Sequence, residues 1–172
     1  IIVSNKAHNF LCRRELKKLG RGASYILEEV GRNTAPAILM AALNTTEDEI
    51  LVIMPADHWI EDSSEFNQII QTASKIATSE DCWVTFGIKP DKPATGYGYI
   101  KADKDFQNEI KNPFKIKRFI EKPNLKLAKE LLKDKSNSWN SGIFIAKASV
   151  LIREMEKFSP EIVILCKQAI KD

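Results

Sequence analysis

The stretch EILVIMPADHWIED, from Glu49 to Asp62, joins a continuous apolar run to a short polar turn and then to the start of a helix. The run Glu49–Met54 is rich in β-branched residues. It predicts a strand covered on both of its faces, as in a parallel sheet. Asp62 and Glu65 resemble a capping box, so we expect a helix over Asp62–Thr78. A buried strand followed by a helix is typical of an α/β fold.

The same alternation of strand and helix patterns continues along the chain. Further strands are expected at Ile1–Val3, Ser24–Glu28, Trp83–Ile88, Tyr97–Lys101, Phe114–Glu121 and Ile143–Ala146. Further helices are expected at Asn5–Leu19, after the cap residues Asn33 and Thr34, at Asn124–Leu132, and from Ser159-Pro160 to Ile170. This order predicts an α/β layered fold, with a mixed, mostly parallel sheet and helices on both of its faces.

Composition narrows the class of protein. The 172 residues fit one domain or most of one, and a net charge of +3 does not indicate a nucleic-acid partner. The three cysteines, Cys12, Cys82 and Cys166, are far apart and favour reduced thiols. No apolar run approaches the roughly 20 residues that span a bilayer, and no signal peptide is visible. We therefore expect a soluble, cytoplasmic protein with no membrane partner. The opening Ile1-Ile2-Val3, without Met, indicates a piece of a longer protein.

Polar clusters follow several of the predicted strands, where ligands bind in open α/β sheets. The first is Gly31-Arg32-Asn33-Thr34, at the start of a helix. Free N–H groups and the positive end of the helix dipole favour an anion or a base carbonyl there. The alternative is that Asn33 or Thr34 is only a helix cap and Arg32 only a surface charge.

The second cluster is Asp57-His58, directly after the central strand. A carboxylate at a strand end can hold Mg²⁺, which often takes one or two carboxylates plus substrate phosphates. For Asp57 a metal ligand and a structural turn are alternatives of similar weight. His58 fits a base or ligand, but a hydrogen-bonded structural role is the more common one for a lone histidine.

Two more clusters lie further along the chain. Glycines flank an aromatic residue in Thr95–Tyr99, which lets backbone approach a ligand but is also typical of a plain turn. Glu121-Lys122-Pro123 and Trp139-Asn140-Ser141-Gly142 offer an acceptor for sugar hydroxyls, a cation for phosphate and an amide. Surface charges and a loop amide explain each of these equally well.

Taken together and in order, these motifs are far more specific. EEVGRNTAPA, MPADHWIED, VTFGIKPDKPATGYGYI, FIEKP and WNSGIF run over nearly the whole chain. The set resembles the nucleotidyltransferase domain of mannose-1-phosphate guanylyltransferases, of the type often fused to a C-terminal mannose-6-phosphate isomerase domain. The resemblance implies a Rossmann-like nucleotidyltransferase fold. It also implies that GTP and mannose 1-phosphate are joined into GDP-mannose with Mg²⁺ as cofactor, a reaction of polysaccharide biosynthesis.

Some functional residues can be carried over by position. The resemblance implies that Asp57 binds the metal and that Lys122 lies near the sugar phosphate, so both are candidate catalytic residues. Glu121 matches the residue that binds sugar hydroxyls. Asn140 matches the sugar-contacting asparagine of the WNSG motif.

Other matches concern substrate binding alone. Gly96 and Tyr97 match the loop that lines the sugar, and Arg32 and Asn33 match the GRNTAPA signature near the nucleotide. Glu29 departs from the pattern, because a proline is common there.

The resemblance also implies parts that these residues do not contain. Family members begin with a glycine-rich loop, GGxGxR, followed by a lysine, and together these hold the triphosphate. Neither this loop, nor a later segment with a second metal-binding Asp, nor an isomerase domain occurs in the 172 residues. We therefore expect residues 1–172 to be a partial nucleotidyltransferase domain that is inactive alone.

Two other functions remain as alternatives. One is a sugar-nucleotide-binding module without catalysis. The other is a related sugar-1-phosphate nucleotidyltransferase with a different sugar or base. The sequence leaves open whether the parent chain is bifunctional and whether it forms a homo-oligomer.

Overall fold

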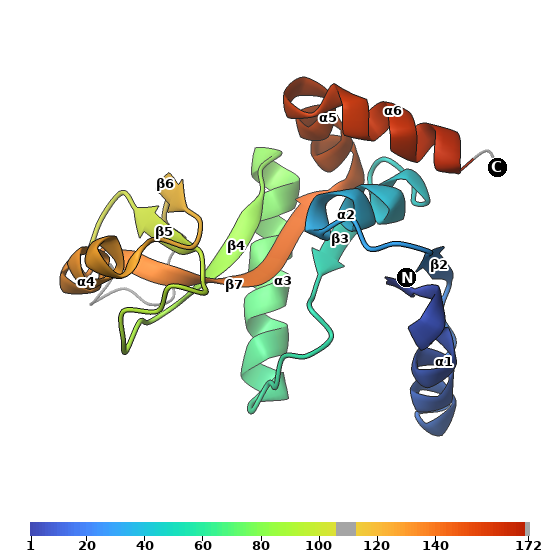
Figure 1. Ribbon diagram of the computed structural model, residues 1–172, viewed down its shortest axis with the longest axis horizontal. Coiled ribbons are helices and arrows are strands. Elements are labelled where there is room, and N and C mark those ends of the chain that lie inside the picture. The colour runs from blue at the N-terminus through green and yellow to red at the C-terminus, as the bar shows by residue number, and fades with distance from the viewer. Residues whose placement is uncertain (106–112, 171–172) are drawn as a thin grey trace. The chain divides into compact units, whose positions relative to one another are not determined.

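The computed structural model describes residues 1–105 and 113–170 and has a mixed α/β architecture (Figure 1). The strands are β1 (Ile2–Asn5), β2 (Tyr25–Glu28), β3 (Ile50–Ile53), β4 (Val84–Ile88), β5 (Tyr99–Ala102), β6 (Ile116–Ile120) and β7 (Asn137–Lys147). The helices are the short 3-10 helix η1 (Lys6–His8), α1 (Asn9–Lys18), α2 (Thr34–Leu43), α3 (Ser63–Glu80), α4 (Leu125–Lys133), α5 (Ala148–Phe158) and α6 (Pro160–Ala169). The predicted α/β class is confirmed. The polar loop expected between β5 and β6 includes residues 106–112, which lie outside the described residues.

The chain forms two compact units. The first unit comprises Ile1–Ile53, Ile60–Val84 and Ile145–Asp172, and the second comprises Met54–Trp59 and Thr85–Phe144. Asp57 and most of the other predicted site residues therefore belong to the second unit.

The core of the first unit lies among α2, α5 and α6. The sequence of α2 is apolar on every side, which predicts a buried helix. Ile38, Leu39 and Ala42 are indeed buried, and they pack with Leu151 and Val163 of the two later helices. In the same unit, β1 and β2 pair in parallel.

α3 begins where the sequence predicts. The Asp62 carboxylate accepts hydrogen bonds from the backbone N–H groups of Ser64 and Glu65, at 2.9 and 2.8 Å. It thereby satisfies two of the N–H groups that a helix start leaves without partners.

A five-stranded sheet runs in the order β3-β7-β5-β6, with β4 also paired to β7. β5 is antiparallel to both β6 and β7. The predicted strand at EILVIM is present as β3, but it is not covered on both faces, because Val52 is 39% exposed.

The second unit has its own core where α4 packs against β5 and β7. Its buried residues are Tyr99, Ala128, Leu131 and Trp139. Tyr99 is fully buried, and its hydroxyl donates a hydrogen bond to the carbonyl of Ala94 at 3.0 Å. A buried phenol needs such a partner, so this bond fixes the chain just before the Gly96-Tyr97 segment.

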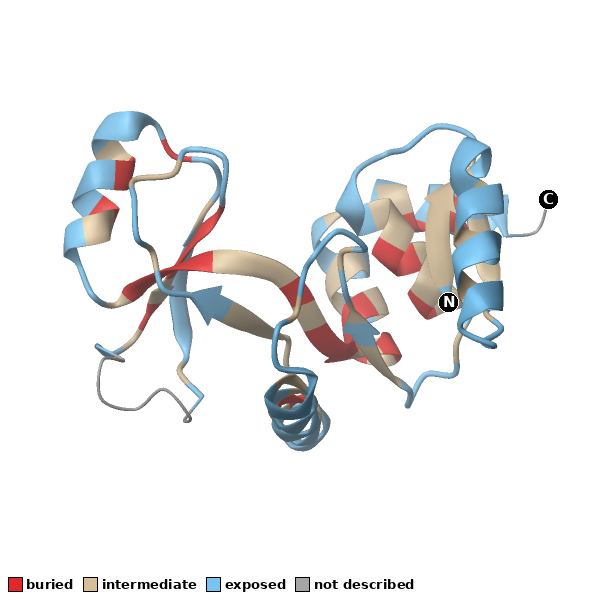
Figure 2. Cartoon of the chain, turned by 90° about the horizontal axis from the view of Figure 1, so that it is seen from below, coloured by how far each residue is buried: buried red, intermediate tan, exposed pale blue. Residues whose placement is uncertain are grey.

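β7 and α5 depart from the predictions. β7 has 11 residues and begins at Asn137, so Trp139-Asn140-Ser141-Gly142 lies inside a strand and not in a loop. Figure 2 shows buried residues in red near both ends of this strand, with half-buried ones between them. α5, which follows β7 directly, was not predicted at all.

The cysteines are free thiols, and burial raises the pKa of Cys82 and of Cys166. Within residues 1–105 and 113–170, no helix combines the length and the apolar character that crossing a membrane requires.

Candidate functional site

Asp57 lies in the turn that follows the carboxyl end of β3. Pro55 helps to end the strand, since proline has no N–H to donate to a neighbouring strand. The side chains of Asp57 and His58 are exposed, and within the described part of the chain neither has a hydrogen bond or an ion pair. The carboxylate is therefore available to a ligand, and the alternative of a hydrogen-bonded structural histidine finds no support.

Gly142 of β7 holds this turn close to the WNSG segment. Its φ is +76°, a backbone conformation that L side chains rarely adopt. A Cβ at Gly142 would lie 3.4 Å from Cγ of Pro55 and 4.0 Å from Cε1 of His58. Pro55 and His58, which flank Ala56-Asp57, thus lie close to Gly142 of β7, two residues along the strand from Asn140.

Gly98 brings two further predicted residues together. Its carbonyl accepts a hydrogen bond from the backbone N–H of Asn140 at 2.8 Å. A Cβ at Gly98 would lie only 2.7 Å from Oε2 of Glu121 and 2.9 Å from Cζ of Phe119. The Glu121 carboxylate therefore lies directly over the backbone of Gly98, an approach that only glycine permits without a shift.

Lys122 has an unusual backbone. Its φ is +42°, in the left-handed region, although it precedes Pro123 and a residue before proline is normally extended. Its ammonium group lies 3.5 Å from Oε1 of Glu121, and both side chains are more than half exposed. Such an exposed pair adds little stability, so the cation and the carboxylate are both accessible to a ligand.

Asn140 is half-buried, and its side chain meets a residue that the predicted site does not include. Oγ1 of Thr85, on β4, lies 2.9 Å from Oδ1 of Asn140 and 2.8 Å from the carbonyl oxygen of Ile143. The signal in the sequence was a hydroxyl inside the otherwise apolar strand WVTFGI.

Gly96 and Tyr97 lie in the segment before β5. A Cβ at Gly96 would meet nothing within 4 Å, so this part of the loop is open. Tyr97 is 50% exposed, and its ring stands edge-on to Trp139 with centroids 5.1 Å apart. Tyr97 thus packs against the buried Trp139 on one side, while about half of its surface is exposed to solvent.

Arg32 and Asn33 belong to the first unit, at the start of α2. Both are exposed. Asn33 occupies the N-cap position, as the sequence predicts, but its side chain makes no capping hydrogen bond. Its backbone, at φ 69° and ψ −173°, lies in a region that is almost restricted to glycine. Such strain is concentrated at functional sites, and the Asn33 side chain leaves the N–H groups at this exposed helix start uncapped.

The described acidic residues bear on which metal the candidate site could hold. Within residues 1–105 and 113–170, no group of three or more His, Cys, Asp or Glu side chains is placed to hold a metal ion. A complete protein cage for a transition metal is therefore absent from this part of the chain. The exposed, unpaired carboxylate of Asp57 does fit Mg²⁺, which needs few protein ligands when substrate phosphates supply the rest.

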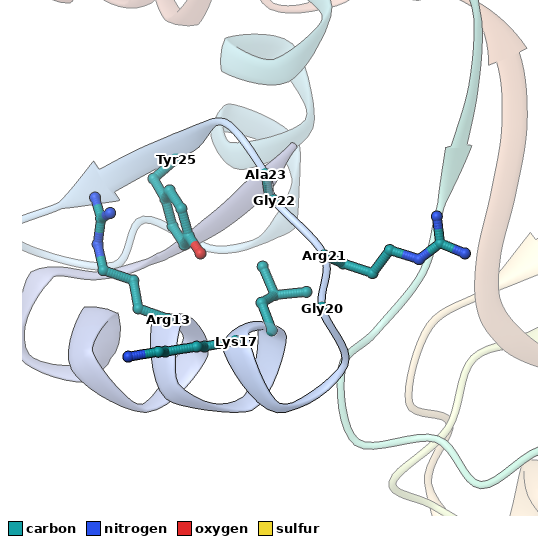
Figure 3. A pocket seen from close by; sticks show the side chains of 8 residues that line it. Arg13, Lys17, Gly20, Arg21, Gly22, Ala23 and Tyr25 are labelled. Carbon is teal, nitrogen blue, oxygen red and sulfur yellow. The ribbon is translucent and has the colours of Figure 1, made fainter.

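A pocket of about 400 Å³ lies elsewhere, in the first unit beside α1 (Figure 3). Its lining includes Arg13, Lys17, Arg21 and Tyr25, and none of the predicted site residues. Cζ of the Arg13 guanidinium lies 4.2 Å from the centroid of the Tyr25 ring, so this cation already stacks on an aromatic side chain. Figure 3 shows the Arg21 side chain pointing away from Tyr25. The pocket has no carboxylate or amide for sugar hydroxyls, so the candidate sugar-phosphate residues are those of the second unit.

Known proteins match this chain over almost its whole length. It is 38% identical to a putative mannose-1-phosphate guanylyltransferase of Vibrio cholerae, over 99% of this chain and 37% of that protein. It is also 38% identical to a mannose-1-phosphate guanylyltransferase of Klebsiella pneumoniae, again over 99% of this chain and 37% of that protein. The chain thus spans about 37% of the length of these curated relatives.

A solved structure is similar as well. The crystal structure of a mannose-6-phosphate isomerase from Helicobacter pylori superposes with a TM-score of 0.89 at 35% identity, covering 99% of this chain and 64% of that one. The sequence model of the nucleotidyl transferase family matches residues 1–172. Since this match includes every residue of the chain, the chain belongs to the nucleotidyl transferase family.

Proposed function

We propose that the protein containing these residues is a mannose-1-phosphate guanylyltransferase, which joins GTP and mannose 1-phosphate into GDP-mannose and releases pyrophosphate. The names of its curated relatives support this substrate pair. The structural observation that carries the proposal is the convergence in the second unit. There the Asp57 turn packs on Gly142, and Gly98 contacts both Asn140 and Glu121.

The reaction needs positioning and charge neutralisation more than proton transfer. A phosphate oxygen of mannose 1-phosphate forms a bond to the α-phosphorus of GTP, and the bond from that phosphorus to the oxygen bridging to the β-phosphate breaks. The nucleophile is already an anion, so no general base is required and His58 has no proton to move. Residues that hold the two phosphates in line therefore account for the rate.

Asp57 would hold Mg²⁺ in this scheme, because its carboxylate is exposed and unpaired in the described part of the chain. When bound, the ion supplies positive charge that offsets the charge of the phosphates. Lys122 supplies a second positive charge from the chain itself and holds the phosphate of the sugar.

The remaining residues divide between sugar and nucleotide. Glu121 accepts hydrogen bonds from sugar hydroxyls, and Asn140 contacts the sugar through its amide. Gly96 and Tyr97 line the sugar. Arg32 and Asn33, at the start of α2, bind the nucleotide, where the helix N-terminus favours negative charge.

The decisive experiment neutralises Asp57 in the full-length protein. Pyrophosphate release from GTP and mannose 1-phosphate is measured as a function of Mg²⁺ concentration. Asp57→Asn should lower kcat by at least about 100-fold, because it removes a charge that the reacting phosphates need. Asp48→Asn is the matched control, since Asp48 is also exposed and in the described part of the chain has no ion pair. Normal Mg²⁺-dependent rates in Asp57→Asn would remove Asp57 from the mechanism.

A substrate panel separates the proposal from its alternatives. The wild-type protein is offered GTP, ATP or UTP, each with mannose, glucose or N-acetylglucosamine 1-phosphate. We expect the highest kcat/KM for GTP with mannose 1-phosphate. A different best pair would identify a related transferase, and binding of GDP-mannose without any pyrophosphate release would identify a binding module.

A second candidate activity comes from the name of the solved structure that this chain resembles, a mannose-6-phosphate isomerase. We propose that the parent protein has this activity too and that it does not use the site in the second unit. The full-length Asp57→Asn protein should then keep its wild-type rate of mannose 6-phosphate isomerisation. An equal loss of both activities would contradict this separation.

A further inference from the structure

Thr85 lies between two acceptors of β7. Its Oγ1 is 2.9 Å from Oδ1 of Asn140 and 2.8 Å from the carbonyl oxygen of Ile143, and both distances are typical of hydrogen bonds. A hydroxyl has only one proton, so it cannot donate to both oxygens at once. If the amide oxygen faces Thr85, the hydroxyl can donate its proton to only one of the two oxygens. The other short contact would then place two oxygen atoms together with no proton between them.

Turning the Asn140 amide by 180° resolves this conflict, since the two ends of an amide are nearly alike in size. Thr85 then donates to the Ile143 carbonyl and accepts from the Asn140 NH₂ group. Both short contacts become hydrogen bonds. In this arrangement the amide oxygen of Asn140 points away from Thr85.

The backbone around this pair leaves Asn140 little freedom. Its N–H donates to the Gly98 carbonyl at 2.8 Å. On β4, Gly87 lies two residues from Thr85 and therefore on the same face of the strand. A Cβ at Gly87 would overlap the side chain of Ser138, so only glycine allows β4 and β7 to come this close. This close approach puts the Thr85 hydroxyl within reach of the amide.

We infer that Thr85 is a positioning residue for the sugar, which orients the Asn140 amide so that its oxygen accepts a hydrogen bond from a ring hydroxyl of the sugar 1-phosphate. The inference rests on the proposed function, because it takes Asn140 as the sugar-contacting residue. Within residues 1–105 and 113–170, Thr85 is the hydrogen-bond partner of the Asn140 side chain. Without Thr85 the amide is free to turn and present NH₂, which can donate to a hydroxyl but cannot accept a hydrogen bond from it.

The test compares Thr85→Val, which keeps the shape but loses the hydroxyl, with Thr85→Ser, which keeps the hydroxyl. In the full-length protein, Thr85→Val should raise KM for mannose 1-phosphate about tenfold, as expected for one lost hydrogen bond in a binding site. KM for GTP and kcat should change little. Thr85→Ser should restore the wild-type KM. Thr78→Val is the matched control, because the Thr78 hydroxyl donates to the carbonyl of Ser74 in its own helix, α3.

A double mutant shows whether Thr85 acts through Asn140. In an Asn140→Ala background, Thr85→Val should cause no further rise in KM for the sugar phosphate. An additive rise, or a wild-type KM in the single Thr85→Val variant, would overturn the inference while leaving the proposed function intact. A wild-type protein that makes no GDP-mannose would instead overturn the proposed function, and the inference with it.

A ratio of kcat/KM values for two substrates can be interpreted even where a variant is partly unfolded, because the fraction of active protein cancels from the ratio. The ratio compares kcat/KM for mannose 1-phosphate with that for analogues that each lack one ring hydroxyl. Thr85→Val and Asn140→Ala should both lose discrimination against the same analogue. Full discrimination in Thr85→Val, or loss at a different hydroxyl, would contradict the assigned role.

Discussion

Lys122 combines a side chain that we propose holds the sugar phosphate with a backbone in the left-handed region. Its φ of +42° places an L side chain in the left-handed region, directly before Pro123. Asn33, which we assign to the nucleotide, shares this property with a φ of +69°. In the described residues the remaining non-glycine case is Asp81, at the end of α3, where a left-handed residue commonly ends a helix. Left-handed backbone away from a helix C-terminus therefore coincides with two residues predicted to bind substrate.

The strain at Lys122 leads to a prediction that separates stability from activity. A left-handed L residue costs about 1–2 kcal/mol, more than the roughly 0.5–1 kcal/mol of chain entropy that glycine costs. Lys122→Gly should therefore be more stable than Lys122→Ala, by up to about 1 kcal/mol in urea unfolding. Both variants lose the cation, so both should be equally impaired in pyrophosphate release. Equal stability of the two would show that the backbone conformation is not strained.

At the scale of the element, the pairing of β5 with β7 assembles much of the candidate site. Tyr99 lies opposite Trp139 in the register, which places Gly98 beside Asn140. On its other side β5 pairs with β6, where Tyr99 lies opposite Ile120, and Glu121 follows directly. Gly98 thus contacts Asn140, which lies on β7, and Glu121, which directly follows β6.

Gly98→Ala tests this arrangement. The new Cβ would lie 2.7 Å from Oε2 of Glu121 and 2.9 Å from Cζ of Phe119, so both the carboxylate and the half-exposed Phe119 ring must shift. KM for mannose 1-phosphate should rise about tenfold or more, as for a lost hydrogen bond to a charged group, while KM for GTP is kept. Gly22→Ala is the control, because its Cβ meets nothing within 4 Å. An unchanged KM for the sugar phosphate in Gly98→Ala would show that this position of Glu121 is not needed.

The elements that the sequence failed to predict have identifiable physical reasons. The first half of β7 is polar, and Asn and Ser favour turns when judged by local propensity. In the structure the Asn137 amide donates to the carbonyls of Leu131 and Asp134, at 3.1 and 3.2 Å, so tertiary hydrogen bonds allow a buried polar strand. α5 was missed because β7 leads into it at Lys147-Ala148 without a glycine, a proline or a side-chain cap.

For the whole molecule, the motifs predicted the class of fold and the family but not the grouping of residues into units. Local patterns predicted the positions of β3, α3 and α4 well, because helix caps and hydrophobic periodicity depend on residues close together in the sequence. The second unit instead joins Met54–Trp59 to Thr85–Phe144, segments that are separated by a complete helix. Contacts at such separation, including that of Thr85 with Asn140, depend on strand pairing that no local pattern specifies.

Carboxylates whose pKa is lowered occur in both units, and each contributes to how stability depends on pH. In the first unit, the hydrogen bond from Lys18 lowers the pKa of Glu15, and that from Lys147 lowers the pKa of Asp81. In the second unit, hydrogen bonds from Ser136 and then Lys101 hold the pKa of Asp134 well below its ordinary range. A group with a lowered pKa contributes its stability above the pKa of the unfolded chain and loses it as the pH falls.

Asp134 offers the clearest test of this dependence. Its carboxylate accepts from the Ser136 hydroxyl at 2.7 Å, from the Ser136 N–H at 3.0 Å and from Lys101 Nζ at 2.9 Å. Asp134→Asn should lower the free energy of unfolding at pH 7 by about 1 kcal/mol, since solvent screens this exposed pair. The difference from wild type should shrink as the pH falls below about 4, because the unfolded wild-type chain then takes up a proton that the folded one resists. Urea unfolding between pH 7 and 2.5 measures it, with Asp48→Asn as the control, since in the described part of the chain this exposed carboxylate has no hydrogen-bond partner. A difference for Asp134→Asn that stays constant over this range would mean that Ser136 and Lys101 do not stabilise the charged carboxylate.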